Sequence, residues 1–131
     1  MGKLRVLFHV NDPDRWGIAF GNITNLINDV GEDNVDTVVL ANGPAVAAYA
    51  DAEKVETMRG LSERGAKFLV CRNSLKKMCS GGAVCISEES LPPFVSVVPA
   101  GITEIIKKQH EGYAYVKPRT ESRIPLAIGS C

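Results

Sequence analysis

Short apolar runs alternate along the chain with longer stretches in which apolar residues recur every three or four positions. Runs of the first kind are typical of buried strands, and stretches of the second kind are typical of helices that bury one face. The runs predict strands over residues 4–10, 35–41, 67–70, 94–98 and 113–117. Because the strands alternate with helices, the pattern favours an α/β fold with a parallel sheet and right-handed crossovers.

The clearest helical pattern follows the first predicted strand. Asp12 can cap this helix, Pro13 suits its first position, and Gly31 can end it. The face that it is expected to bury carries apolar residues at helical spacing: Trp16, Ala19, Phe20, Ile23, Leu26, Ile27 and Val30. A weaker pattern predicts a second helical region over residues 45–64, which Gly65 ends.

Two more helices and a loop complete the second half of the chain. A short helix is predicted after the third strand, with Asn73 or Ser74 as its cap. Residues 83–93 are predicted to form an irregular loop with a turn of helix at residues 87–90. The last helix follows Gly101, and we expect Ile102, Ile105 and Ile106 to share one face of it.

Composition then narrows the class of protein. The 131 residues are 45% hydrophobic and 23% charged, as in ordinary soluble domains. Fifteen basic residues balance fifteen acidic ones, which argues against binding nucleic acid or membranes through bulk charge. No apolar run reaches the ~20 residues of a membrane span, and the N-terminus lacks a signal-peptide pattern. We therefore expect a cytoplasmic protein with one domain at residues 1–118 and a dispensable tail at residues 119–131.

Cys71 is the strongest candidate for chemistry. It is placed where the third predicted strand ends and the next helix begins, and ligands bind at this carboxyl edge of open parallel sheets. A helix N-terminus favours a thiolate over a thiol, and Arg72 would add a full positive charge. The pattern is compatible with a reactive cysteine, but free cysteines are also often small buried hydrophobes, and that interpretation stays open.

The other candidate side chains are weaker. His9 ends the first strand at the same predicted edge, where it could act as a base, orient a ligand or serve only the fold. The glycines in Gly43-Pro44 and Pro99-Ala-Gly101 follow strands, so Gly43 and Gly101 could hold an anion or simply form turns.

The remaining cysteines suggest neither a metal site nor a cofactor. Cys79, Cys85 and Cys131 lack the paired spacing of structural zinc ligands. Cys79 and Cys85 could serve as resolving thiols for Cys71, but we expect them to be reduced and without a role. The chain also lacks the glycine-rich dinucleotide and phosphate-loop motifs, so no bound cofactor is expected.

Several stretches resemble a known family: VLFHVN at residues 6–11, GNITNL at 21–26, VLANG at 39–43, CRNSL at 71–75, VVPAGI at 97–102 and QHEGYAYVKP at 109–118. The chain resembles the DsrE/DsrF-like proteins, a sulfur-relay group that includes TusD-type subunits, and within it the small stand-alone members. This resemblance implies a three-layer α/β/α fold with a five-stranded parallel sheet of Rossmann-like topology, assembled as a trimer or hexamer.

The resemblance also implies a function. Cys71 would receive sulfane sulfur as a persulfide from a donor protein and pass it to an acceptor thiol. Arg72 and the helix-terminal N–H groups near Asn73 and Ser74 would stabilise the anion. Two alternatives stay open: a non-catalytic oligomeric module that binds a small anion or nucleotide at the sheet edge, and a redox sensor that pairs Cys71 with Cys79 or Cys85.

Overall fold

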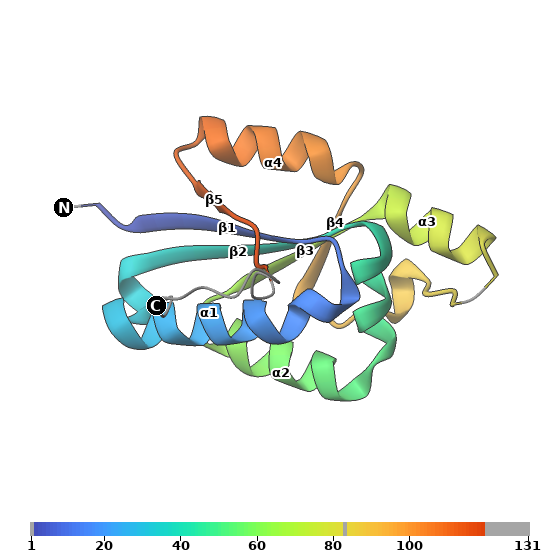
Figure 1. The fold of residues 1–131 in the computed structure, drawn as a ribbon, viewed down its shortest axis with the longest axis horizontal. Coiled ribbons are helices and arrows are strands. Elements are labelled where there is room, and N and C mark those ends of the chain that lie inside the picture. Colours follow the sequence, from blue (N-terminus) through green and yellow to red (C-terminus); the bar gives the residue numbers. More distant parts are fainter. Residues whose placement is uncertain (1, 83, 120–131) are drawn as a thin grey trace, which may run out of the picture.

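Five parallel strands form one sheet in the order β4-β3-β2-β1-β5 (Figure 1). The computed structural model describes residues 2–82 and 84–119. The strands are β1 (Leu4–Val10), β2 (Val35–Ala41), β3 (Lys67–Cys71), β4 (Val95–Val98) and β5 (Ala114–Val116). The predicted five-stranded parallel sheet is therefore confirmed, although β4 and β5 are shorter than expected.

Helices cover both faces of the sheet, as the predicted α/β/α fold requires. On one face lie α1 (Trp16–Val30) and α2 (Ala52–Glu63), and on the other lies α4 (Gly101–His110). The short helix α3 (Arg72–Ser80) extends beyond the carboxyl ends of the strands (Figure 1). Four 3-10 segments connect these elements: η1 (Pro13–Arg15), η2 (Glu32–Asn34), η3 (Gly43–Ala50) and η4 (Glu88–Ser90).

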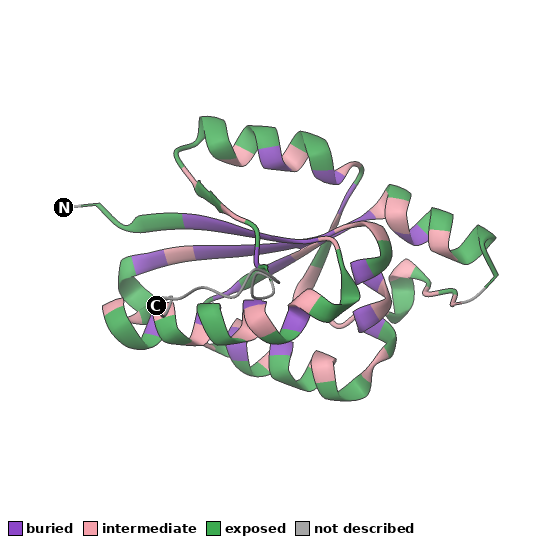
Figure 2. Ribbon diagram, viewed as in Figure 1, coloured by how far each residue is buried: buried purple, intermediate pink, exposed green. Residues whose placement is uncertain are grey.

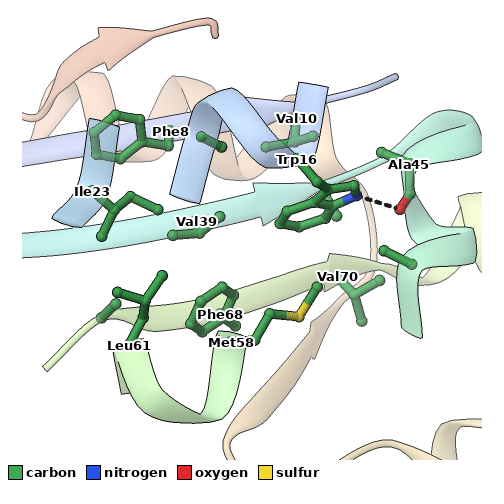
Figure 3. Packing of buried hydrophobic residues seen from close by; sticks show 14 of the residues in the cluster. Phe8, Val10, Trp16, Ile23, Val39, Ala45, Met58, Leu61, Phe68 and Val70 are labelled. Carbon is green, nitrogen blue, oxygen red and sulfur yellow. Dashed lines mark hydrogen bonds between the residues drawn. The ribbon is translucent and has the colours of Figure 1, made fainter. Parts of the chain in front are cut away.

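The face under α1 and α2 holds most of the apolar core. Alternate side chains of the central strands point to it, and they pack against helix residues that recur at helical spacing (Figure 3). Trp16 is fully buried here, and its indole N–H donates a hydrogen bond of 3.0 Å to the carbonyl of Ala45 in η3. This bond ties the start of α1 to the segment that follows β2.

The face under α4 holds a smaller cluster, made of Leu7, Val38, Leu40, Val98 and Ile105. Its helix does not bury all three predicted isoleucines. Ile105 is buried, but Ile102 is 63% exposed and Ile106 is 51% exposed. Ile105 is the member of this face that packs against the sheet, whereas Ile102 and Ile106 lie to either side of the contact. The underside of α4 is the part of the helix that is buried (Figure 2).

Several helix starts differ from the prediction. Pro13 belongs to η1 rather than to α1, and Asp12 makes no side-chain capping bond. The helical region predicted from residue 45 is split in two. The carboxylate of Asp51 accepts bonds from the N–H groups of Glu53 (3.0 Å) and Lys54 (3.2 Å), and so caps α2 after η3.

Two further features concern membrane-spanning helices and the C-terminal tail. Among the residues that the structure describes, no helix is long and apolar enough to cross a bilayer. The tail from residue 120, including the apolar stretch at residues 124–128 and Cys131, lies outside the described residues.

Candidate functional site

Cys71 lies where three elements meet. It is the last residue of β3 and the N-cap of α3, so α3 begins at Arg72 rather than after a cap at Asn73 or Ser74. Its strand partner is Val98, the last residue of β4, and α4 begins just beyond Val98. The N–H of Gly101 at the start of α4 donates to Sγ of Cys71 at 3.3 Å. The sulfur therefore faces the N-termini of two helices.

The surroundings of Cys71 favour its thiolate. The residue is only 5% exposed, and this burial raises the pKa of the thiol. Hydrogen bonds from the Ser74 side chain and from the N–H groups of Ser74, Gly101 and Asn73 act against burial, and the pKa is lowered overall. A cysteine that served only as a small hydrophobe would have no use for these donors.

Arg72 does not take the role predicted for it. Its guanidinium holds the Glu88 carboxylate through two bonds, of 2.6 Å from Nε and 3.2 Å from Nη2. The prediction placed this charge beside the sulfur, but a carboxylate sixteen residues further along the chain already neutralises it. Arg72 thus ties η4 to the first turn of α3.

Ser74 links the two segments that follow β2 and β3. Its hydroxyl oxygen accepts a bond of 2.7 Å from the N–H of Gly43. Gly43 adopts a φ of +57°, which favours glycine. Because the N–H of Gly43 is used within the protein, only Gly101 of the two predicted anion-binding glycines directs its N–H at Cys71.

His9 joins a chain of polar side chains near Cys71. Its Nδ1 lies 2.6 Å from the Tyr115 hydroxyl, and its Nε2 lies 2.8 Å from Oδ1 of Asn42. Because Oδ1 can only accept, Nε2 carries the proton and Nδ1 accepts from Tyr115. Burial lowers the pKa of His9, the bond to Asn42 opposes that shift and the charge of Lys117 adds to it. His9 is therefore held neutral.

Gly101 brings the polar chain and the cysteine together. A Cβ at this glycine would lie 3.3 Å from both Cβ and Nδ2 of Asn42, and 3.5 Å from Cβ of Cys71. Asn42 and Cys71 therefore pack against the same glycine. The site is thus built from the ends of β1, β2 and β3, from β5 and from the start of α4.

Asn42 and Tyr115 were not predicted as site residues. Asn42 follows the buried strand β2 at the carboxyl edge, so its position could have marked it, but the sequence pattern favoured a turn. Tyr115 is separated from His9 by 106 residues. Only the crossover that places β5 beside β1 brings them into contact.

A pocket of about 270 Å³ opens beside the cysteine. Its lining is mostly apolar and consists of Gly43, Pro44, Ser74, Lys77 and Met78. Ser74 lines this pocket and also hydrogen-bonds Cys71. A small molecule or the side chain of a partner in this pocket would therefore be separated from the sulfur only by Ser74.

The expectation for Cys79 and Cys85 was wrong. The structure joins them in a disulfide across the end of α3, rather than leaving both reduced. Cys71 stays free, so the resolving cysteines proposed for it are paired with each other. Within residues 2–82 and 84–119, no group of three His, Cys, Asp or Glu side chains could hold a metal ion.

Comparisons with known proteins agree with this architecture. A model of the DsrE/DsrF-like family matches residues 11–118. The solved structure of the protein of unknown function MTH1491 from Methanobacterium thermoautotrophicum is 30% identical, with a TM-score of 0.75. The match covers 88% of this chain and 100% of that one. No curated protein matched the chain.

Proposed function

The chain belongs to the DsrE/DsrF-like family, and from this membership we propose that it is a sulfur-relay protein that carries sulfane sulfur on Cys71. The family as a whole is associated with sulfur relay. The observation that supports a carrier role for this chain is the N–H of Gly101, which donates to Sγ of Cys71 at 3.3 Å.

The proposed reaction has two transfers of the same kind. The Cys71 thiolate attacks the outer sulfur of a donor persulfide R–S–SH, so an Sγ–S bond forms and the S–S bond of the donor breaks to release RS⁻. An acceptor thiol then gives its proton to the outer sulfur of the Cys71 persulfide anion, and the resulting thiolate attacks that sulfur and releases the Cys71 thiolate. No net oxidation occurs. The donors around Sγ assist both steps because they stabilise the thiolate that attacks first and leaves last.

Access to the sulfur would come from the side of the pocket. Cys71 itself is 5% exposed, which would protect a persulfide from stray reagents. The pocket beside Ser74 has mostly apolar walls and one cationic side chain, Lys77. In this proposal the incoming thiol or persulfide anion enters the pocket near Lys77 and reaches Sγ past Ser74.

The proposal includes assembly and location. We expect a cytoplasmic trimer or hexamer that exchanges sulfur with separate donor and acceptor proteins. Support for assembly comes from the apolar side chains that α4 leaves exposed, Ile102 and Ile106. Light scattering at micromolar concentration is expected to give a mass well above that of a chain, and a clean species of 14.1 kDa would contradict it.

The test of the carrier role separates thiolate chemistry from sulfur uptake. Reduced protein is treated briefly with limiting iodoacetamide between pH 6 and 9, values that bracket the ~8.5 of a free cysteine, and the label is mapped by mass spectrometry. We expect labelling of Cys71 to reach half its maximum at a lower pH than labelling of a free cysteine does, because the pKa of Cys71 is lowered. A parallel sample receives inorganic polysulfide and is expected to gain one sulfur atom on the Cys71 peptide.

Two variants control this test. Cys71→Ser should lose both the label and the added sulfur, whereas Cys79→Ser with Cys85→Ser should keep both on Cys71. If Cys71 reacts more slowly than every other thiol and takes up no sulfur, it is a core residue and the carrier proposal fails.

One observation supports a second candidate function. The disulfide between Cys79 and Cys85 lies at the end of the helix that Cys71 starts. A redox sensor built on this pair would form the bond under mild peroxide and lose it with thioredoxin, whether or not Cys71 is present. Mass mapping of Cys71→Ser after each treatment distinguishes this function from sulfur transfer.

A further inference from the structure

The proposed transfer uses Cys71 and its N–H donors, but it leaves a neighbouring set of polar side chains without a task. Tyr115, His9 and Asn42 form a continuous hydrogen-bonded chain that starts on β5, crosses β1 and ends beside Gly101. His9 is 8% exposed, and it belongs to the face of the sheet that otherwise carries Leu7, Leu40 and Val98. A polar chain with a buried histidine at its centre needs a reason, because an apolar side chain could pack in the place of His9.

The Asn42 amide has its oxygen toward His9. Oδ1 of Asn42 accepts from Nε2–H of His9, so the NH₂ group lies on the opposite side of the amide. On that side, Nδ2 comes within 3.3 Å of the point where a Cβ on Gly101 would lie. The same point is 3.5 Å from Cβ of Cys71. The NH₂ donors are therefore held on the side of Asn42 that neighbours the cysteine.

A persulfide would extend the cysteine by one atom. The bond between two sulfurs is about 2.05 Å long, so the outer sulfur of Cys71–S–S⁻ is carried well beyond Sγ. Sγ itself already accepts from the N–H of Gly101. The outer sulfur bears the charge of the loaded state, and it needs a donor of its own.

We propose that the Asn42 amide holds the outer sulfur of the Cys71 persulfide, and that His9 and Tyr115 are positioning residues that keep its NH₂ group directed at that sulfur. This inference rests on the proposed carrier function. Asn42 is a neutral donor, so it would stabilise the loaded anion without protonating it. Gly101 is part of the arrangement because any side chain at this position would separate Asn42 from Cys71.

The role of Tyr115 follows from the two forms of a neutral histidine. The Tyr115 hydroxyl donates to Nδ1, which keeps the ring proton on Nε2. Without that hydroxyl the proton can move to Nδ1, and Nε2 then becomes an acceptor. Asn42 would turn its NH₂ group toward His9 and its carbonyl toward the sulfur, so the donor for the persulfide would be lost.

The experiment measures how long a loaded persulfide survives in variants of the full chain. Each variant is loaded with inorganic polysulfide, freed of excess reagent and sampled over time by mass spectrometry for the sulfur on the Cys71 peptide. Asn42→Asp keeps the shape of the side chain and the acceptor for His9, removes both N–H donors and adds a negative charge, which acts against the persulfide anion in the same direction. Tyr115→Phe removes one hydroxyl far from the sulfur. Tyr113→Phe is the matched control, because Tyr113 packs beside Lys108 and outside the polar chain.

We expect the persulfide lifetime to fall by about tenfold or more in Asn42→Asp, the scale of a lost hydrogen bond to a charged group. In Tyr115→Phe the persulfide lifetime should fall about threefold, because the Asn42 amide can then adopt both orientations instead of only the one that directs its NH₂ group at the sulfur. Tyr113→Phe should keep the persulfide lifetime of the chain without substitutions. A second readout is the iodoacetamide rate of Cys71 well above its pKa, which Tyr115→Phe should leave within about twofold.

The outcomes separate this inference from the function on which it rests. If the unmodified protein never loads sulfur, the carrier function and this inference both fail. If it loads sulfur and both Asn42→Asp and Tyr115→Phe keep its lifetime, only this inference is overturned. An equal fall in lifetime and in alkylation for Tyr115→Phe would show a merely structural role and would also overturn it.

Discussion

The two faces of the sheet are built for different purposes. The face under α1 and α2 is apolar except for the buried Thr37 of β2, and two helices cover it (Figures 2 and 3). Large side chains such as Trp16 and Phe68 are fully buried there. Each contributes on the order of 1.5–3 kcal/mol through its buried apolar surface.

The face under α4 is apolar only in part. Leu7, Val38 and Leu40 form its core, but at the carboxyl edge the apolar side chains give way to His9, Asn42 and Cys71. A single helix covers this face, and the helix begins at the glycine that contacts both Asn42 and Cys71. One face of the sheet therefore supplies stability, whereas the other has polar and reactive side chains in place of some apolar ones.

The strongest way to test this division is to remove one large side chain from each face. Phe68→Ala empties a site at 1% exposure, where the ring also packs edge-on against Phe94. We expect it to cost about 3–5 kcal/mol in the free energy of unfolding, measured by urea denaturation. Ile105→Ala, on the α4 face, should cost about 2 kcal/mol, near the lower end for such a truncation, because the surroundings of a single covering helix can relax.

The same pair of variants should separate in function. Below the urea transition, Phe68→Ala should keep the sulfur uptake of Cys71, since it alters the opposite face. Ile105→Ala should reduce uptake, because it loosens the helix that carries the N–H of Gly101. If Ile105→Ala proves the more destabilising variant and leaves uptake unchanged, the two faces do not divide stability from function.

How much of this could be read from the sequence follows the same division. Apolar spacing predicted the strands and the buried face of α1, because the residues that pack on the α1 and α2 face recur at the sequence period of a strand or a helix. The position of Cys71 at a strand–helix junction could also be predicted. The contacts of His9 with Tyr115 and Asn42 could not, because they depend on the strand order, which places β5 beside β1 although Tyr115 and His9 are 106 residues apart in sequence.

Charge was harder to place than apolar pattern. Arg72 is adjacent to Cys71 in sequence, yet its guanidinium meets Glu88 of η4. The exposed isoleucines of α4 show the same limit, because spacing defines a helical face but not which side of it meets the sheet. Local sequence therefore predicted elements well and partners poorly.

Gly101 is the point at which α4 meets the site, and the space around it can be tested directly. Gly101→Ala places a Cβ 3.3 Å from Cβ and Nδ2 of Asn42, so the neighbours must move. We expect a loss of about 1–3 kcal/mol by overpacking, together with slower alkylation of Cys71 near neutral pH as its bond from residue 101 lengthens. Urea denaturation and timed labelling measure the two effects.

Gly60→Ala is the matched control for this prediction. Gly60 lies within α2, and a Cβ there would meet nothing within 4 Å. The substitution should stabilise the protein by up to about 1 kcal/mol, because alanine favours helix more than glycine does. Equal effects of the two substitutions would mean that the space around Gly101 imposes no constraint on the site.

The smallest expected effect concerns Arg72, on the rim beyond both faces. Its ion pair with Glu88 is more than a third exposed on each side, so water screens the pair and Arg72→Ala should leave the free energy of unfolding nearly unchanged in urea denaturation. Because the guanidinium is already neutralised, the alkylation rate of Cys71 at neutral pH should change by less than about threefold.

Glu88→Gln is the complementary variant, because it frees the guanidinium instead of removing it. If Arg72 acted on the sulfur, Arg72→Ala would slow alkylation strongly, and Glu88→Gln would accelerate it by freeing the guanidinium. We expect neither change, because the thiolate is held by the N–H donors of α3 and α4 on the inner side of the edge, whereas Arg72 is turned to η4.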